Sequence, residues 1–189
     1  TVIGSAIAFG LIGISNVLVP VYFGYEYMPC IMLINLLSIT VFFISWANVV
    51  RTQYLMPLHH DKIYVESMII GAVANFIINS MLIPKFAGVG AAIGTIVAEF
   101  TVMIVQMIGI RKELPIFLFC GKSIPYLVIG FIMQIIVKKY GMIFGISITT
   151  LIGQVVVGGV VYCLLCGCYF KLFKDELGTM IISEINKKI

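Results

Sequence analysis

The feature that most constrains this chain is a series of long apolar runs without a charged side chain. Residues 1–25 contain no Asp, Glu, Lys or Arg, and residues 27–50 repeat the pattern. A helix that crosses a bilayer needs about 20 consecutive apolar residues. Membrane β-barrels instead use roughly 10-residue segments of alternating polarity, which these continuous runs do not show. The sequence therefore predicts an all-α fold, a polytopic membrane helix bundle.

Composition narrows the possible function classes. Apolar residues make up 61% of the 189 residues and charged residues only 11%, whereas soluble domains have roughly 45–50% and about 25%. The length allows about six membrane helices with short loops, and leaves no soluble domain for conventional catalysis. The net charge of +4 forms no basic stripe, so a nucleic-acid partner is not expected. We therefore expect that the protein is not an enzyme and that it binds no cofactor. We also expect no metal site, because the adjacent His59, His60 and Asp61 lack a second spaced pair of ligands.

Charges and prolines predict where the helices begin and end. The linker from Pro84 to Gly88 is so short that the helices on either side must form an antiparallel hairpin. The fifth helix reaches full length only if Lys138 and Lys139 extend to the membrane surface. We expect one transmembrane lobe over residues 1–170 and a cytoplasmic tail over 171–189. The predicted helices cover about 1–20, 30–50, 65–83, 88–110, 124–139 and 142–170.

The basic residues predict the orientation of the bundle. Six crossings put both ends of the chain on one side, and nine of the 12 basic residues fall on that side. They are Arg51, Lys62, Arg111, Lys112, Lys122, Lys171, Lys174, Lys187 and Lys188. Cytoplasmic loops carry an excess of Lys and Arg. We therefore expect a multi-pass protein of the cytoplasmic membrane with both of these ends in the cytoplasm.

Polar side chains inside the predicted helices are the candidate functional residues. In hydrocarbon such groups must find a partner or face a wet cavity. Their helical spacing puts one polar stripe on each of several helices, and these stripes predict a cavity for a hydrophilic group. The alternative interpretation is hydrogen bonding between helices of the bundle. The candidate cavity-lining residues are Asn48, Arg51, Asn75, Asn79, Thr95, Glu99 and Gln106.

Two of these candidates carry a charge. Glu99 is the one acidic residue deep inside a predicted span, where a lone carboxylate costs a few kcal/mol. It is either a protonatable or cation-binding site of a transport path, or a hydrogen-bonded structural residue. Arg51 ends the second predicted helix, where it could bind a phosphate or act as a plain basic anchor at the membrane surface.

Residues 75–99, NFIINSMLIPKFAGVGAAIGTIVAE, resemble the C-terminal lobe of polysaccharide biosynthesis flippases, the Wzx-type transporters of O-antigen and capsule repeat units. The same superfamily contains multidrug extruders. The segment FGYEY at residues 23–27 and the pair Thr52-Gln53 also look like that family. The resemblance covers about residues 10–112. The chain begins with Thr1 in an apolar run without a signal-peptide pattern, so we expect a piece of a longer protein.

This resemblance implies a two-lobed transporter of twelve to fourteen helices, of which the chain supplies the last six. The implied partners are a membrane lipid-linked glycan, the missing N-terminal lobe and polysaccharide-assembly proteins. The implied activity moves an undecaprenyl-diphosphate-linked oligosaccharide outward by alternating access. Apart from Lys138 and Lys139 at the membrane surface, the six predicted helices contain no Arg or Lys to meet the diphosphate, so this contact would come from Arg51 or from the missing lobe. The alternatives are an ion-coupled multidrug efflux pump and a non-transporting membrane subunit.

Overall fold

The computed structural model describes residues 2–173, and these residues form helices joined by short connections, without a strand. The predicted tail covers residues 171–189, and its part beyond Phe173 lies outside the described residues. Two short helical elements, η1 and η2, accompany the five long helices. The elements are α1 (Val2–Tyr22), η1 (Tyr25–Tyr27), α2 (Cys30–Val50), η2 (Arg51–Leu55), α3 (Asp61–Ile110), α4 (Ile116–Phe144) and α5 (Ile148–Phe173).

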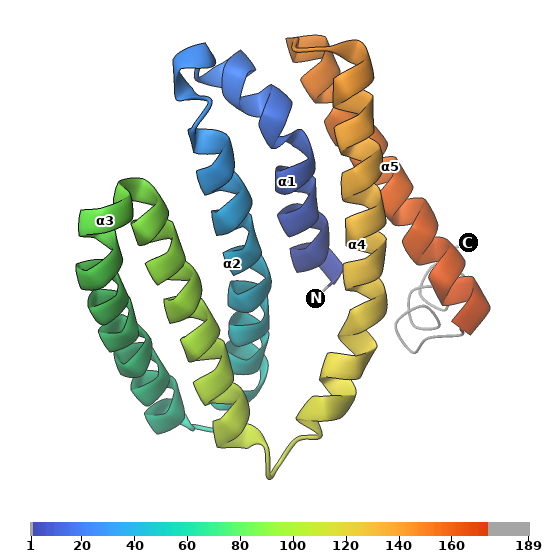
Figure 1. Ribbon diagram of the computed structural model, residues 1–189. Coiled ribbons are helices and arrows are strands. Elements are labelled where there is room, and N and C mark those ends of the chain that lie inside the picture. The colour runs from blue at the N-terminus through green and yellow to red at the C-terminus, as the bar shows by residue number, and fades with distance from the viewer. Residues whose placement is uncertain (1, 174–189) are drawn as a thin grey trace.

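Helix α3 is a hairpin of two antiparallel arms rather than one straight rod (Figure 1). Its 50 residues are interrupted at Ala87, whose backbone is non-helical with φ 46° and ψ −123°. The following Gly90 allows the second arm to lie close to the first, because it packs on the backbone of Leu82, whereas Gly88 faces Leu33 of α2. Further along the hairpin, Gly71 packs against Val102. The predicted hairpin is therefore present, although the first arm continues through Pro84 instead of ending there.

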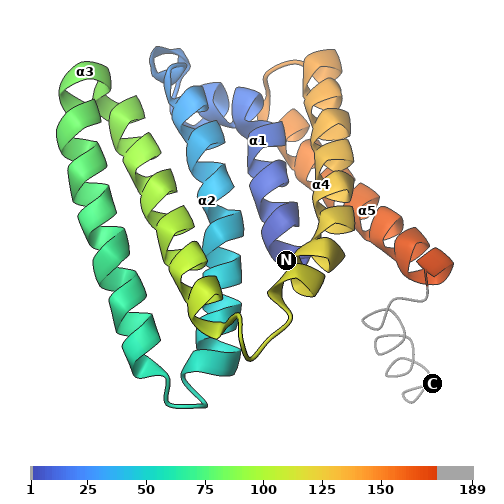
Figure 2. The ribbon, with the colours of Figure 1, turned by 60° about the horizontal axis from the view of Figure 1, so that its bottom comes forward.

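The six helical segments of residues 2–173 alternate in direction. Figures 1 and 2 show the two arms of α3, then α2, α1 and α4, following one another across the molecule, with α5 against α4. Small residues let the segments approach each other closely, as expected where helices pack in a membrane. Gly4 of α1 packs on Ser45 of α2, and Gly13 of α1 packs on Val137 of α4. Helix α5 is joined to α1 by Tyr162, whose hydroxyl donates to the Val2 carbonyl at 2.7 Å.

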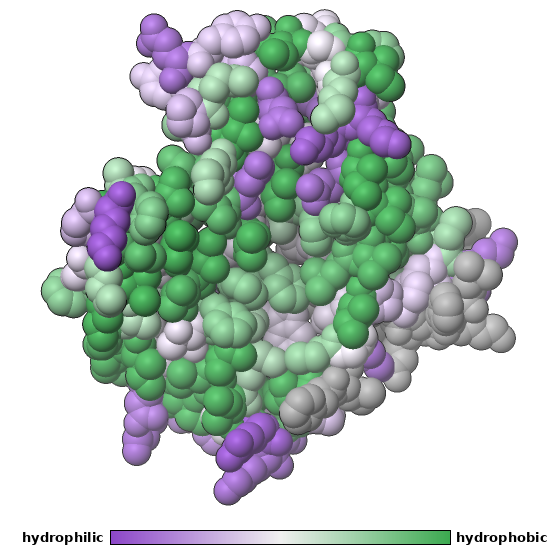
Figure 3. All heavy atoms as spheres, viewed as in Figure 1, coloured by the Kyte–Doolittle hydropathy of each residue, from purple (hydrophilic) through white to green (hydrophobic). Residues whose placement is uncertain are grey.

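The surface of the bundle fits a bilayer. Five helices of the described residues are long and apolar enough to cross a membrane, and the hairpin α3 counts as one of them. Apolar side chains cover the middle of the face in Figure 3, whereas strongly hydrophilic side chains gather at the two ends. Many large apolar side chains are exposed, including Phe76 at 74% and Ile143 at 76%. Such exposure is favourable where the side chains contact lipid instead of water.

Several predicted helix boundaries differ from the structure. The third helix begins at Asp61 rather than near 65, because the acidic Asp61 suits the first turn and Lys62 pairs with Glu66 one turn later. The fifth helix, predicted over 124–139, is α4 over Ile116–Phe144, so neither Lys122 nor Pro125 interrupts it. The last helix begins at Ile148 rather than 142, because Gly145, with φ 74°, ends α4.

Candidate functional site

Asn75 and Asn79 lie one turn apart on the first arm of α3. The Asn79 side-chain amide donates to the Asn75 side-chain oxygen at 2.5 Å, while the Asn79 oxygen is buried without a partner. That oxygen lies against Gly94 of the second arm, where a larger residue would displace it. Both asparagines line an open pocket of about 420 Å³ that also includes Phe76 and Ser80. The sequence thus brings two amides and an aromatic ring to one side of the hairpin.

Gln106 makes a buried contact inside the hairpin. Its side-chain amide donates to the Ser67 hydroxyl at 3.1 Å, and both side chains are at most 1% exposed. The Ser67 hydroxyl donates in turn to the Tyr64 carbonyl at 2.7 Å. This chain of hydrogen bonds connects the two arms, so Gln106 holds the hairpin together in the way expected of polar residues between membrane helices.

Glu99 has no hydrogen bond or ion pair among the described residues, and its side chain is half-buried. Its neighbours define its direction. The Ala98 carbonyl lies against Gly71 of the first arm, and the Phe100 ring meets the Phe43 ring of α2 with centroids 5.2 Å apart. Successive helical residues are rotated by about 100°. The Glu99 carboxylate therefore points out of the layer formed by α2 and the two arms of α3.

Thr95 lies one turn before Glu99, on the same side of the second arm. Its hydroxyl donates to the Ala91 carbonyl of its own helix at 3.0 Å. This internal bond satisfies the hydroxyl donor and leaves the oxygen able to accept another hydrogen bond. Thr95 and Glu99 therefore form a small polar patch on an otherwise apolar face.

The other two candidates lie near the end of α2. Asn48 is exposed, and its backbone carbonyl accepts a hydrogen bond from Thr52 at 2.6 Å. Arg51 is half-buried and contacts Tyr64 of α3. Its Nη1 donates to the Tyr64 hydroxyl at 3.4 Å, and its guanidinium carbon lies 5.5 Å from the centre of the Tyr64 ring. Arg51 thereby connects η2 to the first arm of α3.

The seven predicted residues thus form separate groups. Asn75 and Asn79 share a pocket, Thr95 and Glu99 share a helix face, and Gln106 and Arg51 each make contacts between segments. Neither Arg51 nor Glu99 lines the pocket of Asn75 and Asn79. In the described residues alone, the polar stripes do not merge into one enclosed cavity. A cavity lined by these polar stripes would need another part of the protein to face the side of α3 that carries Thr95 and Glu99.

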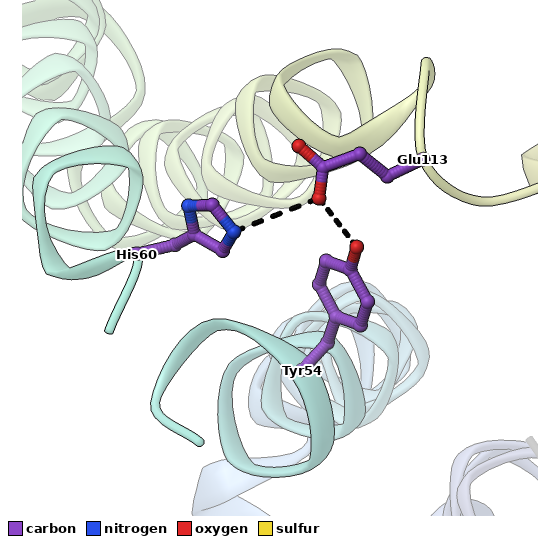
Figure 4. A network of polar contacts seen from close by, with 3 residues as sticks. All are labelled: Tyr54, His60 and Glu113. Atoms are coloured by element: carbon purple, nitrogen blue, oxygen red, sulfur yellow. Dashed lines mark hydrogen bonds and ion pairs between the residues drawn. The ribbon is translucent and has the colours of Figure 1, made fainter. Parts of the chain in front are cut away.

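A cluster that the sequence did not predict lies where the α2–α3 and α3–α4 connections meet (Figure 4). The Tyr54 hydroxyl donates to the Glu113 carboxylate, and His60 Nε2 lies 3.6 Å from the same oxygen. The Tyr54 and His60 rings are stacked, with an angle of 11° between their planes. Glu113 is 59 residues from Tyr54 in the chain, so no local pattern could have indicated the contact.

A second pocket, of about 480 Å³, lies beside this cluster, between α2, α4 and the first turn of α1. Its walls are largely apolar and include Val50, Ile110 and Phe119. Polar side chains are also present, among them Gln53, Lys122 and Ser123. The sequence predicts that Lys122 lies between the helices over 88–110 and 124–139, whereas the structure has it within the second turn of α4. Lys122 lines this pocket because α4 begins at Ile116 rather than at the predicted residue 124.

Comparisons with known proteins support membrane integration. The chain is 31% identical over 147 residues to an uncharacterized membrane protein of Methanocaldococcus jannaschii. The match covers 78% of this chain and 28% of that relative, so the chain corresponds to little more than a quarter of the relative's length. No family model and no solved structure matches the chain. Together with the five apolar helices, this distant homology identifies a multi-pass integral membrane protein.

Proposed function

We propose that this chain is the C-terminal lobe of a transporter that moves a lipid-linked oligosaccharide across the cytoplasmic membrane. The lobe would supply six membrane segments, with the remaining segments in another part of the same protein. The relative is consistent with such a larger protein, because this chain matches only 28% of its length. The glycan substrate rests on the resemblance of residues 75–99 to polysaccharide flippases. These residues form the part of the α3 hairpin around its turn at Ala87.

The observation that carries the transport proposal is the environment of Glu99. The residue lies about 11 positions into the second arm of α3, or roughly 16 Å along it. A carboxylate at that depth in an otherwise apolar segment is costly unless water or a partner reaches it, and such groups mark ion and substrate pathways. Glu99 has no polar partner among the described residues and points out of the layer. A facing second lobe would enclose it in a polar cavity.

Alternating access gives this arrangement a mechanism. The two lobes would rock about the cavity between them, while the lipid chain of the substrate stays in the bilayer. Glu99 would bind a proton or another cation in one state and release it in the other, which links the rocking motion to an ion gradient. Asn75 and Asn79, with Phe76 between them, offer hydrogen bonds and an apolar ring to passing sugar groups. Glu99 would thus supply the coupling, and the asparagines would supply polar contacts along the path.

Deletion of the gene tests the proposed function. Cells without the protein should accumulate lipid-linked oligosaccharide in the inner leaflet and lose the corresponding surface polysaccharide. The wild-type gene should restore both. The measurement is extraction of the lipid-linked glycan, together with its accessibility to an impermeant oxidant on intact spheroplasts.

The same strain distinguishes the alternative, an ion-coupled efflux pump. A lone acidic residue such as Glu99 also suits the binding of an organic cation. A pump of that kind predicts an unchanged lipid-linked glycan and increased sensitivity to ethidium and similar cations. A strain unaffected in both respects contradicts both transport proposals and favours a non-transporting membrane subunit.

A further inference from the structure

The two arms of the α3 hairpin face each other in a fixed register. Contacts between the arms join positions that are nearly equally far from the turn at residues 86–87. These pairs are Asn79 with Gly94, Leu82 with Gly90 and Ser67 with Gln106. The same register places Phe76 of the first arm level with residues 96–97 of the second. Phe76 therefore lies at the depth between Thr95 and Glu99.

The side of the second arm that carries Thr95 and Glu99 is defined by the residues just before them. Glu99 follows Ala98, whose carbonyl lies against Gly71 of the first arm. Thr95 follows Gly94, which lies against the first arm at Asn79. One helical position corresponds to a rotation of about 100°. Thr95 and Glu99 are thus each turned by about a quarter of a circle away from the contact between the arms.

The first arm repeats this arrangement on the same side of the hairpin. Ala72 follows the contact residue Gly71, and Ser80 follows the contact residue Asn79. Both line the asparagine pocket together with Phe76. Two antiparallel helices are related by an approximate two-fold axis perpendicular to the plane of the pair, so equivalent offsets from the contact lie on one face. The asparagine pocket and the Thr95–Glu99 patch therefore share one face of the hairpin.

The groups on this shared face suit a sugar ring. The Phe76 ring is 74% exposed and offers an apolar surface to the C–H face of a pyranose. Ser80 beside it is exposed, and Thr95 and Glu99 lie at neighbouring depths on the other arm. Their hydroxyl and carboxylate oxygens accept hydrogen bonds from sugar hydroxyls, which need such partners when they leave water.

The charge of the face favours sugars without a carboxylate. Residues 1–50, 63–84 and 86–110 contain no Lys or Arg. Glu99 is the one charged residue between positions 67 and 84 or 86 and 110. An acidic sugar would therefore bring its carboxylate close to that of Glu99 without a cation from α1, α2 or the inner parts of the hairpin arms. Like charges placed together act against the wrong ligand.

We propose that the shared face binds one sugar ring of the transported glycan and selects a ring without a carboxylate. The C–H face of the ring lies on Phe76, and its hydroxyls reach Ser80 and Glu99 across the hairpin. The inference rests on the proposed function for the carrier of the sugar, the lipid-linked glycan. It adds the class of sugar and joins the asparagine pocket and Glu99 in a single recognition surface.

Binding of small glycosides to the purified full-length protein in lipid nanodiscs tests the proposal. The neutral probes are methyl β-D-glucoside, methyl β-D-galactoside and methyl N-acetyl-β-D-glucosaminide, and the acidic probe is methyl β-D-glucuronide. Saturation-transfer NMR at pH 8 measures the affinities and identifies the ring protons nearest to the protein. At least one neutral glycoside should bind about tenfold or more tightly than the glucuronide, because only the glucuronide meets Glu99 with a like charge.

Two substitutions separate the contributions of the ring and the charge. Phe76→Ala should weaken binding of the neutral glycoside by about fivefold or more, whereas Phe76→Tyr keeps the ring and the affinity. Glu99→Gln should keep neutral binding and raise the affinity for the glucuronide to a similar level. Phe86→Ala is the matched control, because Phe86 is also exposed on the hairpin but lies ten residues, or about 15 Å, from Phe76. Its affinities should equal those of the wild type.

The outcomes separate this inference from the proposed function. Binding of no neutral glycoside, equal affinity for the glucuronide in the wild type, or unchanged affinity in Phe76→Ala overturns the sugar site. The deletion strain described above decides the transport role independently. Selective glycoside binding with unchanged lipid-linked glycan in that strain keeps the sugar site and removes the transport role. Loss of glycan export without glycoside binding has the opposite meaning.

Discussion

Gly94→Leu should prevent the α3 hairpin from closing and should remove most of the folded protein from the membrane. A Cβ atom at this position would collide with the side-chain amide of Asn79 on the opposite arm. Leucine adds a branched side chain to this contact, and Asn79 is already held by its hydrogen bond to Asn75. Overpacking of a tight interface costs about 1–3 kcal/mol, and more where the neighbour cannot move. The measurement is the monodisperse yield after detergent extraction, with the thermal unfolding midpoint of the remaining protein.

Gly159→Leu is the matched control for this variant. Gly159 is also a glycine inside a membrane-length helix, but a Cβ there would meet no atom within 4 Å. Its yield and unfolding midpoint should remain close to those of the wild type. If Gly94→Leu behaves like Gly159→Leu, the two arms do not pack as closely as described.

Glu99→Gln should leave the protein folded and abolish the export of lipid-linked glycan that we propose. Glutamine keeps the size and the hydrogen-bonding groups of the side chain but cannot bind and release a proton. Because Glu99 makes no polar contact within residues 2–173 that the substitution would break, stability should not fall. Removal of the titratable group should lower export by at least about tenfold if proton transfer is required in each cycle. Export is measured by the glycan-accessibility assay across a range of external pH.

Glu66→Gln provides the comparison for a carboxylate outside the proposed path. Glu66 is exposed near the start of α3 and lies 3.9 Å from Lys62. An exposed pair of this kind contributes little to stability, and its loss should not change export. If Glu99→Gln exports glycan as well as Glu66→Gln does at every pH, Glu99 has a structural role only.

The hairpin could be predicted from the sequence because its causes are local. A short linker between two apolar runs permits only antiparallel neighbours, and glycines at 90 and 94 permit close approach. The ends of the helices were harder to predict. Lys122 and Pro125 are ordinarily signs of a boundary, yet α4 includes both. Membrane helices tolerate an internal proline where neighbouring groups satisfy the freed backbone carbonyl.

The candidate site could be predicted only in part, because helical spacing reveals which residues share a face but not what that face meets. Spacing puts Gln106 with Thr95 and Glu99, whereas the structure directs its amide to Ser67 in the other arm. The contact between Tyr54 and Glu113 depends on two connections that meet only after the bundle has formed. Likewise, the pocket at Lys122 needs α2 and α4 side by side.

Cysteine accessibility in intact cells can establish whether the chain crosses the membrane six times. Single cysteines at Glu26, Phe86 and Ile146 report on one end of the bundle, and those at His59 and Lys112 report on the other. The background is a variant without the five native cysteines. In intact cells an impermeant maleimide should label positions 26, 86 and 146. Positions 59 and 112 should react only after permeabilisation. Reaction of position 86 from the side opposite to position 26, or of position 112 together with position 26, would rule out six crossings.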